Sequence, residues 1–315
     1  MSKYGILAIT LMLFMSALVA PSMGEITIYG VSKSDVKGQI GTPGFSVAGV
    51  PLPLTLTDAI SINNGSMGFD FDIYYNKTAG KKAAVKHVSF LKTGVPDREL
   101  ATVTINNSDE NPALTQPANS NPSGGNVSAY VLMGRKWTQL NPRVRMSLKN
   151  DALWSATGMT IQSSLGAITA AGNTWDRGTN QDLFLDAGAN TTSTANWKYD
   201  GINNMAFTPY ASGCTALAAT GVWYKTQGIP AGEMYKIVES DMTFNSNLKW
   251  TTTGETGKLD FQSVVLHELG HTIGLGDLYN KAAFTKDTRQ VMHYYTGVKR
   301  TLGNGDATGV WKLYG

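Results

Sequence analysis

Three residues near the C-terminus have the types and the spacing of a zinc-dependent hydrolase. His267 and His271 are four positions apart, and Glu268 directly follows the first histidine. Side chains four positions apart project from one face of a helix, so both imidazoles can reach a single metal ion. A zinc ion lowers the pKa of a water molecule that it binds to about 7. Glu268 is placed to take the proton from that water and later to deliver it to the leaving group, so we predict it as the general base.

A catalytic zinc site also needs a third protein ligand and an open fourth position. Gly274, three residues after the second histidine, is a residue at which a helix could end with a positive φ angle, and the turned chain would bring Asp277 back towards the metal. No glutamate occurs after Glu268, which excludes a third ligand of that type on a later helix. Asp277 is therefore the predicted third ligand. The other downstream residues that could ligate are Asp287, His293 and Asp306.

The surrounding segments predict the elements that hold these residues in place. Residues 264–266 supply an apolar face for a helix over about 260–274, and Asp260 can cap its first turn. A second helix is expected over about 157–175, where apolar residues recur at helical spacing. Strands are expected at 130–146, 202–207, 216–224 and 235–244, and a last helix from about 305. This order of elements predicts a mixed α/β (α+β) domain over 126–315.

Composition and the N-terminus predict an exported protein without a nucleic-acid partner. The net charge is +3 with a pI near 8.7, and the chain has no long block of lysine and arginine. Lys3 precedes an apolar run over 5–20 that small residues follow, which is typical of a signal peptide over 1–24. The run is shorter than the roughly 20 residues of a bilayer span, so we expect no stable membrane insertion after cleavage. The expected location is secreted or extracellular, including association with a cell surface, and the single cysteine, Cys214, excludes an internal disulfide.

The residues that precede the predicted catalytic domain divide into a β-rich part and a linker. Residues 25–113 contain three runs of strand-forming residues, at 26–29, 69–75 and 101–105, with glycine and asparagine clusters between them. Residues 114–125 are polar and rich in proline, asparagine, serine and glycine, which is typical of a linker. The sequence leaves open whether the β-rich part is a prosegment that is removed or an accessory domain that is retained.

The extended motif resembles that of the metzincin metallopeptidases, H-E-x-x-H-x-x-G-x-x-(H or D), followed by a tight turn with a methionine beneath the metal. This chain has the motif over 267–277 and then the turn sequence Q-V-M-H-Y over 290–294. The aspartate in the third ligand place, Asp277, resembles the snapalysin group. The M-H-Y run resembles the turn of astacins, in which the tyrosine helps to bind zinc or steadies the oxyanion. The resemblance implies this catalytic role for Tyr294.

Two flanking segments resemble matrixins and extend the resemblance to about 126–315. Residues 305–315 are similar to the matrixin terminal helix, D-x-x-G-x-x-x-x-Y-G, and residues 241–245 are similar to the strand that precedes the matrixin zinc helix. The resemblance implies a twisted mixed sheet with a zinc-bearing helix, preceded here by the β-rich N-terminal domain. It also implies a catalytic Zn²⁺ that the two histidines and the aspartate hold.

The chain departs from the matrixin pattern in two ways. Matrixins commonly carry a second, structural zinc on histidines before the zinc helix, but the only histidine before His267 is His87, so we expect no such site. Matrixin prosegments silence the zinc with a cysteine, and the similar string over 93–97 has a threonine in its place, so it cannot act as that switch. Calcium stays open as a second metal, with the candidate ligands Asp182, Asp186 and Asp200.

These observations predict a zinc endopeptidase of the metzincin type that hydrolyses protein or peptide substrates. A peptide would lie extended along an edge strand, expected near 216–224, by strand addition. Two alternatives stay open: a non-enzymatic surface-binding protein with a structural metal site, and a zinc amidase that acts on cell-wall crosslinks. Glu268 argues against the first alternative, because no ligand role requires it. Neither the cleavage preference nor the oligomeric state is predicted.

Overall fold

The computed structural model describes most of the chain from residue 127 onwards and several separate segments before it. The described residues are 7–9, 26–29, 33–38, 44–52, 58, 61–62, 65–76, 87–92, 100–106, 127–140, 144–190, 197–278, 284 and 287–315. The predicted linker over 114–125 and most of the predicted signal peptide lie outside these residues. Among the helices that are described, none combines the length and the apolar character that a membrane span requires.

The elements alternate between strands and a few helices. The helices are α2 (Ala152–Ser155), α3 (Ile161–Asp176), α4 (Phe261–Thr272) and α5 (Asn304–Tyr314), with a 3₁₀ helix at Lys33–Asp35. The strands before residue 140 are β1 (Leu7–Ile9), β2 (Ile26–Tyr29), β3 (Val36–Lys37), β4 (Ser46–Val47), β5 (Val50–Pro51), β6 (Met67–Tyr75), β7 (His87–Lys92), β8 (Leu100–Asn106), β9 (Val127–Leu132) and β10 (Arg135–Lys136). The later strands are β11 (Met146–Lys149), β12 (Gly188–Asn190), β13 (Asn203–Thr208), β14 (Ala216–Lys225), β15 (Tyr235–Asn245), β16 (Trp250–Thr251) and β17 (Leu259–Asp260).

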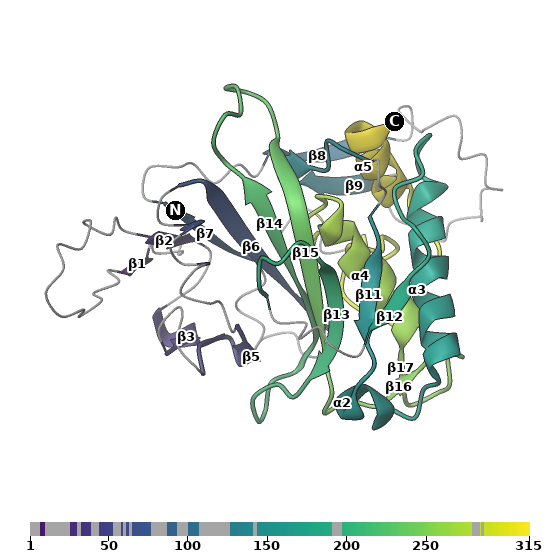
Figure 1. Cartoon of the computed structure of the whole chain (residues 1–315). Coiled ribbons are helices and arrows are strands. Elements are labelled where there is room, and N and C mark those ends of the chain that lie inside the picture. Colours follow the sequence, from purple (N-terminus) through teal and green to yellow (C-terminus); the bar gives the residue numbers. More distant parts are fainter. Residues whose placement is uncertain are drawn as a thin grey trace, which may run out of the picture.

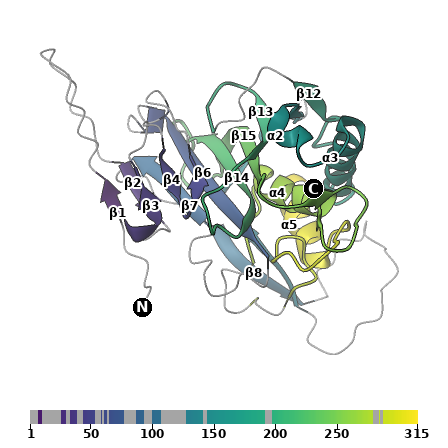
Figure 2. The same cartoon turned by 90° about the horizontal axis from the view of Figure 1, so that it is seen from below.

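One large mixed sheet joins strands from both halves of the chain (Figures 1 and 2). Its order is β1-β2-β7-β6-β14-β15-β13-β11-β12, and β10 pairs with the start of β15. Strands β15, β13, β11 and β12 are parallel to their neighbours in this series, whereas β14 is antiparallel to β15. The mixed α/β class and the predicted helices that became α3, α4 and α5 are confirmed.

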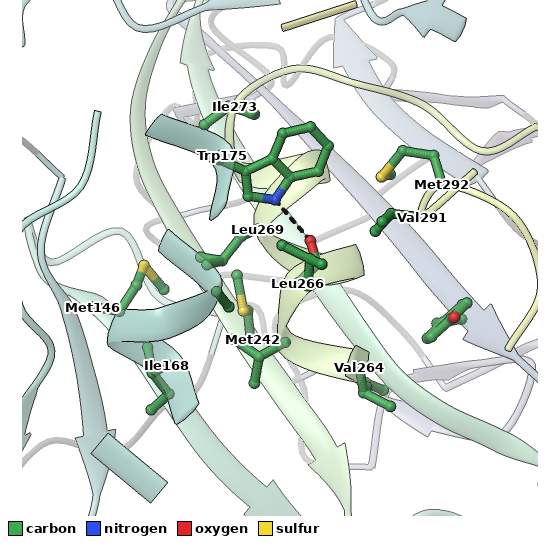
Figure 3. Packing of buried hydrophobic residues seen from close by; sticks show 14 of the residues in the cluster. Met146, Ile168, Trp175, Met242, Val264, Leu266, Leu269, Ile273, Val291 and Met292 are labelled. Carbon is green, nitrogen blue, oxygen red and sulfur yellow. Dashed lines mark hydrogen bonds between the residues drawn. The ribbon is translucent and has the colours of Figure 1, made fainter. Parts of the chain in front are cut away.

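The main apolar core lies where α3 and α4 pack against each other and against the sheet (Figure 3). Ile168 and Trp175 of α3 are buried in the same cluster as Met242 of β15 and Leu269 of α4. The indole N–H of Trp175 also donates a 2.8 Å hydrogen bond to the backbone carbonyl of Leu266. Burial of side chains this large removes much apolar surface from water, so the position of α4 is strongly fixed.

The strand expected over 130–146 is not continuous. The chain forms β9, turns at Gly134, whose φ angle is 70°, and then forms the short strands β10 and β11. A positive φ angle of this size interrupts an extended strand and is adopted readily by glycine. Trp137 lies after β10, outside any strand, where its indole N–H bonds to the carbonyl of Thr272.

The expectation that 216–224 forms an edge of the sheet is wrong. Strand β14 pairs with β15 on one side and with β6, from the N-terminal half, on the other. The apolar side chains of β6 explain this arrangement, since Phe69, Phe71 and Ile73 are all buried in a second core cluster together with Trp223 of β14. The N-terminal strands therefore extend the sheet of the C-terminal half.

Asp260 fixes the first turn of α4. One of its carboxylate oxygens accepts a 2.9 Å hydrogen bond from the backbone N–H of Ser263, and Arg300 donates to both oxygens at 3.1 and 2.5 Å. Burial raises the pKa of Asp260, but the hydrogen bonds from Arg300 and Ser263 outweigh it, so the pKa lies below its ordinary value. The carboxylate is thus charged in the folded chain over the neutral pH range.

We expect Asp260→Ala to lower the free energy of unfolding by about 2 kcal/mol, because the helix cap is lost and a partly buried Arg300 is left unpaired. Asp260→Asn should cost about half as much, since the amide oxygen can still cap the helix. Denaturant unfolding at neutral pH measures both values.

Because the pKa of Asp260 is lower in the folded state, its charge stabilises the fold above the ordinary carboxyl pKa of about 4 and less below it. The difference between wild type and Asp260→Asn should shrink as the pH falls through that range. An unchanged difference at low pH would show that the charge contributes nothing.

Candidate metal centre

Three buried side chains converge between α4 and the chain that follows it. His267 Nε2 lies 3.2 Å from His271 Nε2 and 3.2 Å from the nearer carboxylate oxygen of Asp277, and His271 Nε2 lies 3.5 Å from that oxygen. In the described part of the chain, no other group of three or more histidine, cysteine or acidic residues has its ligating atoms within 4.8 Å of one another. The structure thus brings together the three residues that the sequence predicts as ligands.

This donor set fits zinc. Two imidazole nitrogens and one carboxylate oxygen are a common ligand set of zinc in hydrolytic enzymes, with a further position left open. Asp277 is 4% exposed, and neither of its carboxylate oxygens accepts a hydrogen bond from a described residue. A buried charge without hydrogen bonds is costly, and a cation at this point would balance it.

Backbone carbonyls orient both imidazole rings. Nδ1 of His267 lies 2.8 Å from the carbonyl oxygen of Val291, and Nδ1 of His271 lies 2.9 Å from the carbonyl oxygen of Leu275. A carbonyl can only accept a hydrogen bond, so each Nδ1 carries the proton and each Nε2 presents its lone pair to the centre. Such partners fix the ring and the tautomer that a metal requires.

Gly274 makes the turn that returns the chain to the two histidines. Helix α4 ends at Thr272, and Gly274 has a φ angle of 98°. Its N–H bonds to the carbonyl of His271 at 2.9 Å, and a Cβ atom at this residue would collide with the backbone carbonyl of Arg135. Both the backbone angle and the close approach require glycine here. Asp277 follows in a position to face the histidines.

The two carboxylates near His271 favour a positive charge at the centre. Burial lowers the pKa of His271, but Asp72 and Asp277 raise it by more, to about 10. Burial raises the pKa of Asp277, but the charges of His271 and His267 outweigh it and hold the pKa below its ordinary value. A proton and a metal ion compete for the same Nε2 position, so the same negative charges favour either cation.

Glu268 is buried beside the three candidate ligands. One carboxylate oxygen, Oε2, accepts a 2.5 Å hydrogen bond from the hydroxyl of Thr220 on β14, and Oε1 has no hydrogen-bond partner among the described residues. Burial raises the pKa of Glu268 to about 8, and the hydrogen bond from Thr220 moderates the increase. A buried carboxylate with one oxygen free of hydrogen bonds from the described residues can accept a proton from water and pass it on, as a general base and acid must.

The turn around Met292 packs against α4, and Figure 3 shows Val291 and Met292 beside the helix. The carboxylate of Asp306 accepts hydrogen bonds from the N–H groups of Val291 and Met292, at 2.6 and 3.1 Å. A Cβ atom on Gly270 of α4 would collide with the Met292 sulfur, so the helix and the turn are in direct contact. Asp306 therefore holds the same turn whose Val291 carbonyl orients His267.

The alternative ligands do not belong to the group of three side chains that converges. His293 is buried, and burial together with the charge of Lys299 lowers its pKa to about 4, but it does not belong to the group that could hold a metal. Asp287 accepts hydrogen bonds from Ala129 and Gln290. Tyr294 packs against both apolar clusters and its ring lies beside His293, so its catalytic role stays a prediction.

The three candidate calcium ligands form no metal-binding group among the described residues. The backbone N–H of Asp200 donates to the buried carboxylate of Glu239 at 3.0 Å. Calcium therefore gains no support from the arrangement of these side chains.

Three residues near the centre were not predicted from the sequence. The ring of Tyr74 stacks on the ring of His267, with 3.5 Å between centroids and an interplanar angle of 12°. A carboxylate oxygen of Asp72 lies 3.9 Å from His271 Nδ1, and Thr220 contacts Glu268. Tyr74 and Asp72 belong to β6, and no local pattern indicates that a strand so distant in sequence would pair beside α4.

Comparisons with known proteins agree with this geometry. A family model described as matrixin matches residues 225–315. Karilysin of Tannerella forsythia is 28% identical over 187 residues, which is 59% of this chain and 34% of karilysin. The chain therefore spans about a third of the length of this relative. The C-terminal part of the chain is therefore similar to a matrixin domain.

The third ligand can be tested by zinc affinity alone. Asp277→Asn removes a charged ligand, so it should weaken zinc binding by at least roughly tenfold. Loss of a residue that only orients a ligand already weakens metal binding by about that factor. His293→Gln should bind zinc as the wild type does. Competition with a chromophoric chelator measures both affinities, and the reverse result would make His293 the ligand.

Proposed function

We propose that this chain, with its matrixin-like catalytic domain, is a secreted zinc-dependent endopeptidase. The observation that carries the proposal is the buried Glu268, which lies next to the converging His267, His271 and Asp277 and presents an oxygen without a hydrogen-bond partner. The comparisons support a metallopeptidase, and the apolar run after Lys3 supports export. Its substrates would be proteins or peptides.

Each residue of the centre has a distinct task. His267, His271 and Asp277 would hold the zinc ion, which when bound supplies Lewis-acid chemistry and makes water more acidic. Oε1 of Glu268 accepts a proton from the attacking water and returns it to the nitrogen of the leaving amine. The hydroxyl of Thr220 holds the other oxygen, Oε2, so that the carboxylate keeps one orientation.

Tyr294 is proposed to steady the oxyanion that develops on the scissile carbonyl. The support for this role is its place two residues after Met292, in the turn that Asp306 holds. The phenol would have to point towards the substrate once a peptide is bound.

A structural metal site is the main alternative, and the surroundings of Glu268 disfavour it. A structural zinc site is closed by four protein ligands, whereas three converge among the described residues. A buried carboxylate oxygen without a hydrogen-bond partner in this part of the chain costs stability without a gain in a purely structural site. A zinc amidase would use the same groups, and only its substrate would differ.

The test is hydrolysis of casein and of a quenched peptide library. Each substrate is assayed with the chain before and after its brief treatment with trypsin, in the presence of a chelator and again after zinc is restored. Glu268→Gln should lower turnover by about 10²- to 10⁴-fold, because the base is lost, while zinc binding persists. Glu255→Gln is the matched control, since Glu255 is exposed and pairs with Lys258 on the surface.

Unchanged hydrolysis in Glu268→Gln would reject the proposed role of this residue. Zinc binding without hydrolysis of any peptide by the wild type would favour the structural site or the amidase.

A further inference from the structure

Alternate side chains of β6 lie beside the candidate metal centre. Successive side chains of a strand point to opposite faces of the sheet. Phe71 and Ile73 are buried in the second apolar cluster, whereas Tyr74 is buried in the core that contains α4, with 3.5 Å between the centroids of its ring and that of His267. Asp72 lies between Phe71 and Ile73 in sequence and therefore on the same face as Tyr74. This face of β6 borders the metal centre.

The carboxylate of Asp72 lies between two imidazole rings. Its Oδ1 is 2.8 Å from Nδ1 of His87 on the neighbouring strand β7, and its Oδ2 is 3.9 Å from Nδ1 of His271. A carboxylate accepts hydrogen bonds, so His87 is the donor and holds Oδ1. The side chain of Asp72 is only 3% exposed, so solvent ions screen its charge little. The carboxylate is therefore held with Oδ2 towards a predicted metal ligand.

The negative charge near Nδ1 of His271 affects how well this ring binds a cation. When an imidazole binds a cation through Nε2, electron density moves towards the cation, and the N–H at Nδ1 becomes more positive. Outer groups that stabilise this N–H orient the ring and make it a more basic ligand. The carbonyl of Leu275 accepts the hydrogen bond from Nδ1 at 2.9 Å, and Asp72 adds a full negative charge near the same atom. Asp72 thus favours the cation-bound form of His271.

We propose that Asp72 is a positioning residue of the zinc site, which acts through His271 and raises the affinity of the centre for the ion. The inference deepens the proposed function and rests on it for the identity of the metal. Asp72 is not itself a ligand, since it does not belong to the group of three side chains that converges. The ligands thus come from the C-terminal half of the chain, and a charge that supports one of them comes from the N-terminal half.

Hydrolysis is a poor measure of this role, because the charge of Asp72 also affects Glu268. Burial raises the pKa of Glu268 to about 8, and the charges of Asp277 and Asp72 add to the increase. Loss of the Asp72 charge therefore changes the general base as well as the ligand, and kcat would report both effects together. Zinc affinity avoids this problem, because Glu268 is not one of the predicted ligands.

The first test compares two substitutions of Asp72 that separate its charge from its shape. Asp72→Asn keeps the size and loses the charge, so it should weaken zinc binding by about tenfold. Asp72→Glu keeps the charge and adds a methylene, so it should bind zinc more tightly than Asp72→Asn does. A merely structural role predicts the opposite order, because a buried site tolerates an isosteric side chain better than a larger one. Competition with a chromophoric chelator measures these affinities in the full chain.

Glu255→Gln is the matched control, since it removes one negative charge from an exposed pair with Lys258. This variant should bind zinc as the wild type does. Denaturant unfolding of the metal-free chains shows whether each variant folds. Wild-type affinity in Asp72→Asn, or weaker binding by Asp72→Glu than by Asp72→Asn, would overturn the proposal.

A second measurement shows whether Asp72 acts through His271. The chain has four histidines, so the imidazole signals of the zinc-loaded chain with isotope-labelled histidine are few and can be assigned by substitution. In Asp72→Asn the Nδ1–H signal of His271 should shift, whereas that of His267, which bonds to the carbonyl of Val291, should stay in place. Equal shifts of both signals, or an unchanged signal of His271, would contradict the inference.

The zinc measurements separate failure of this inference from failure of the proposed function. If the wild type hydrolyses peptides but all Asp72 variants bind zinc equally well, only the inference fails. If the affinities follow the expected order but no peptide is hydrolysed by the wild type, the peptidase proposal fails and the role of Asp72 stands.

Discussion

A buried carboxylate that accepts no hydrogen bond from any described residue lies at the centre of this structure. The carboxylate of Asp277 is buried, and the groups that face it are the Nε2 atoms of two histidines. Two features bring the carboxylate there: the glycine turn at Gly274, against the backbone of Arg135, and the turn around Met292, which Asp306 clamps. The fold thus holds three polar side chains together away from water, an arrangement whose desolvation cost a bound cation would offset. Such preorganisation is what a metal site requires.

The features that the sequence predicted correctly are local. The i, i+4 spacing of the histidines, the cap at Asp260 and the turn at Gly274 each depend on a few neighbouring residues, and each is found where the pattern indicated. The helices followed from apolar periodicity, which reports the face that a single element buries. Such signals do not require knowledge of the remaining chain.

The features that were missed depend on pairing between distant segments. The composition of β6 predicted a strand but not its partner, because backbone hydrogen bonds carry no information about sequence. The open edge expected for 216–224 followed from the C-terminal half alone, in which no residue indicates that β6 pairs with β14. Thr220 and Tyr74 were not predicted for the same reason. Their positions beside Glu268 and His267 depend on the register of β14 against β6 and on the packing of α4 against these strands. The strand predicted over 130–146 was wrong for a local reason instead. A single residue, Gly134, has a positive φ angle and divides the run of strand-forming residues.

The pairing of β14 on both of its edges affects how readily the folded chain associates with other molecules. In the folded chain both edges of β14 pair with neighbouring strands, β15 on one side and β6 on the other. Without β6, this ten-residue, largely apolar strand would be the border of the sheet. An exposed border of that length is a template for intermolecular β-pairing and aggregation. Pairing with β6 thus also protects β14 from association with further copies of the chain.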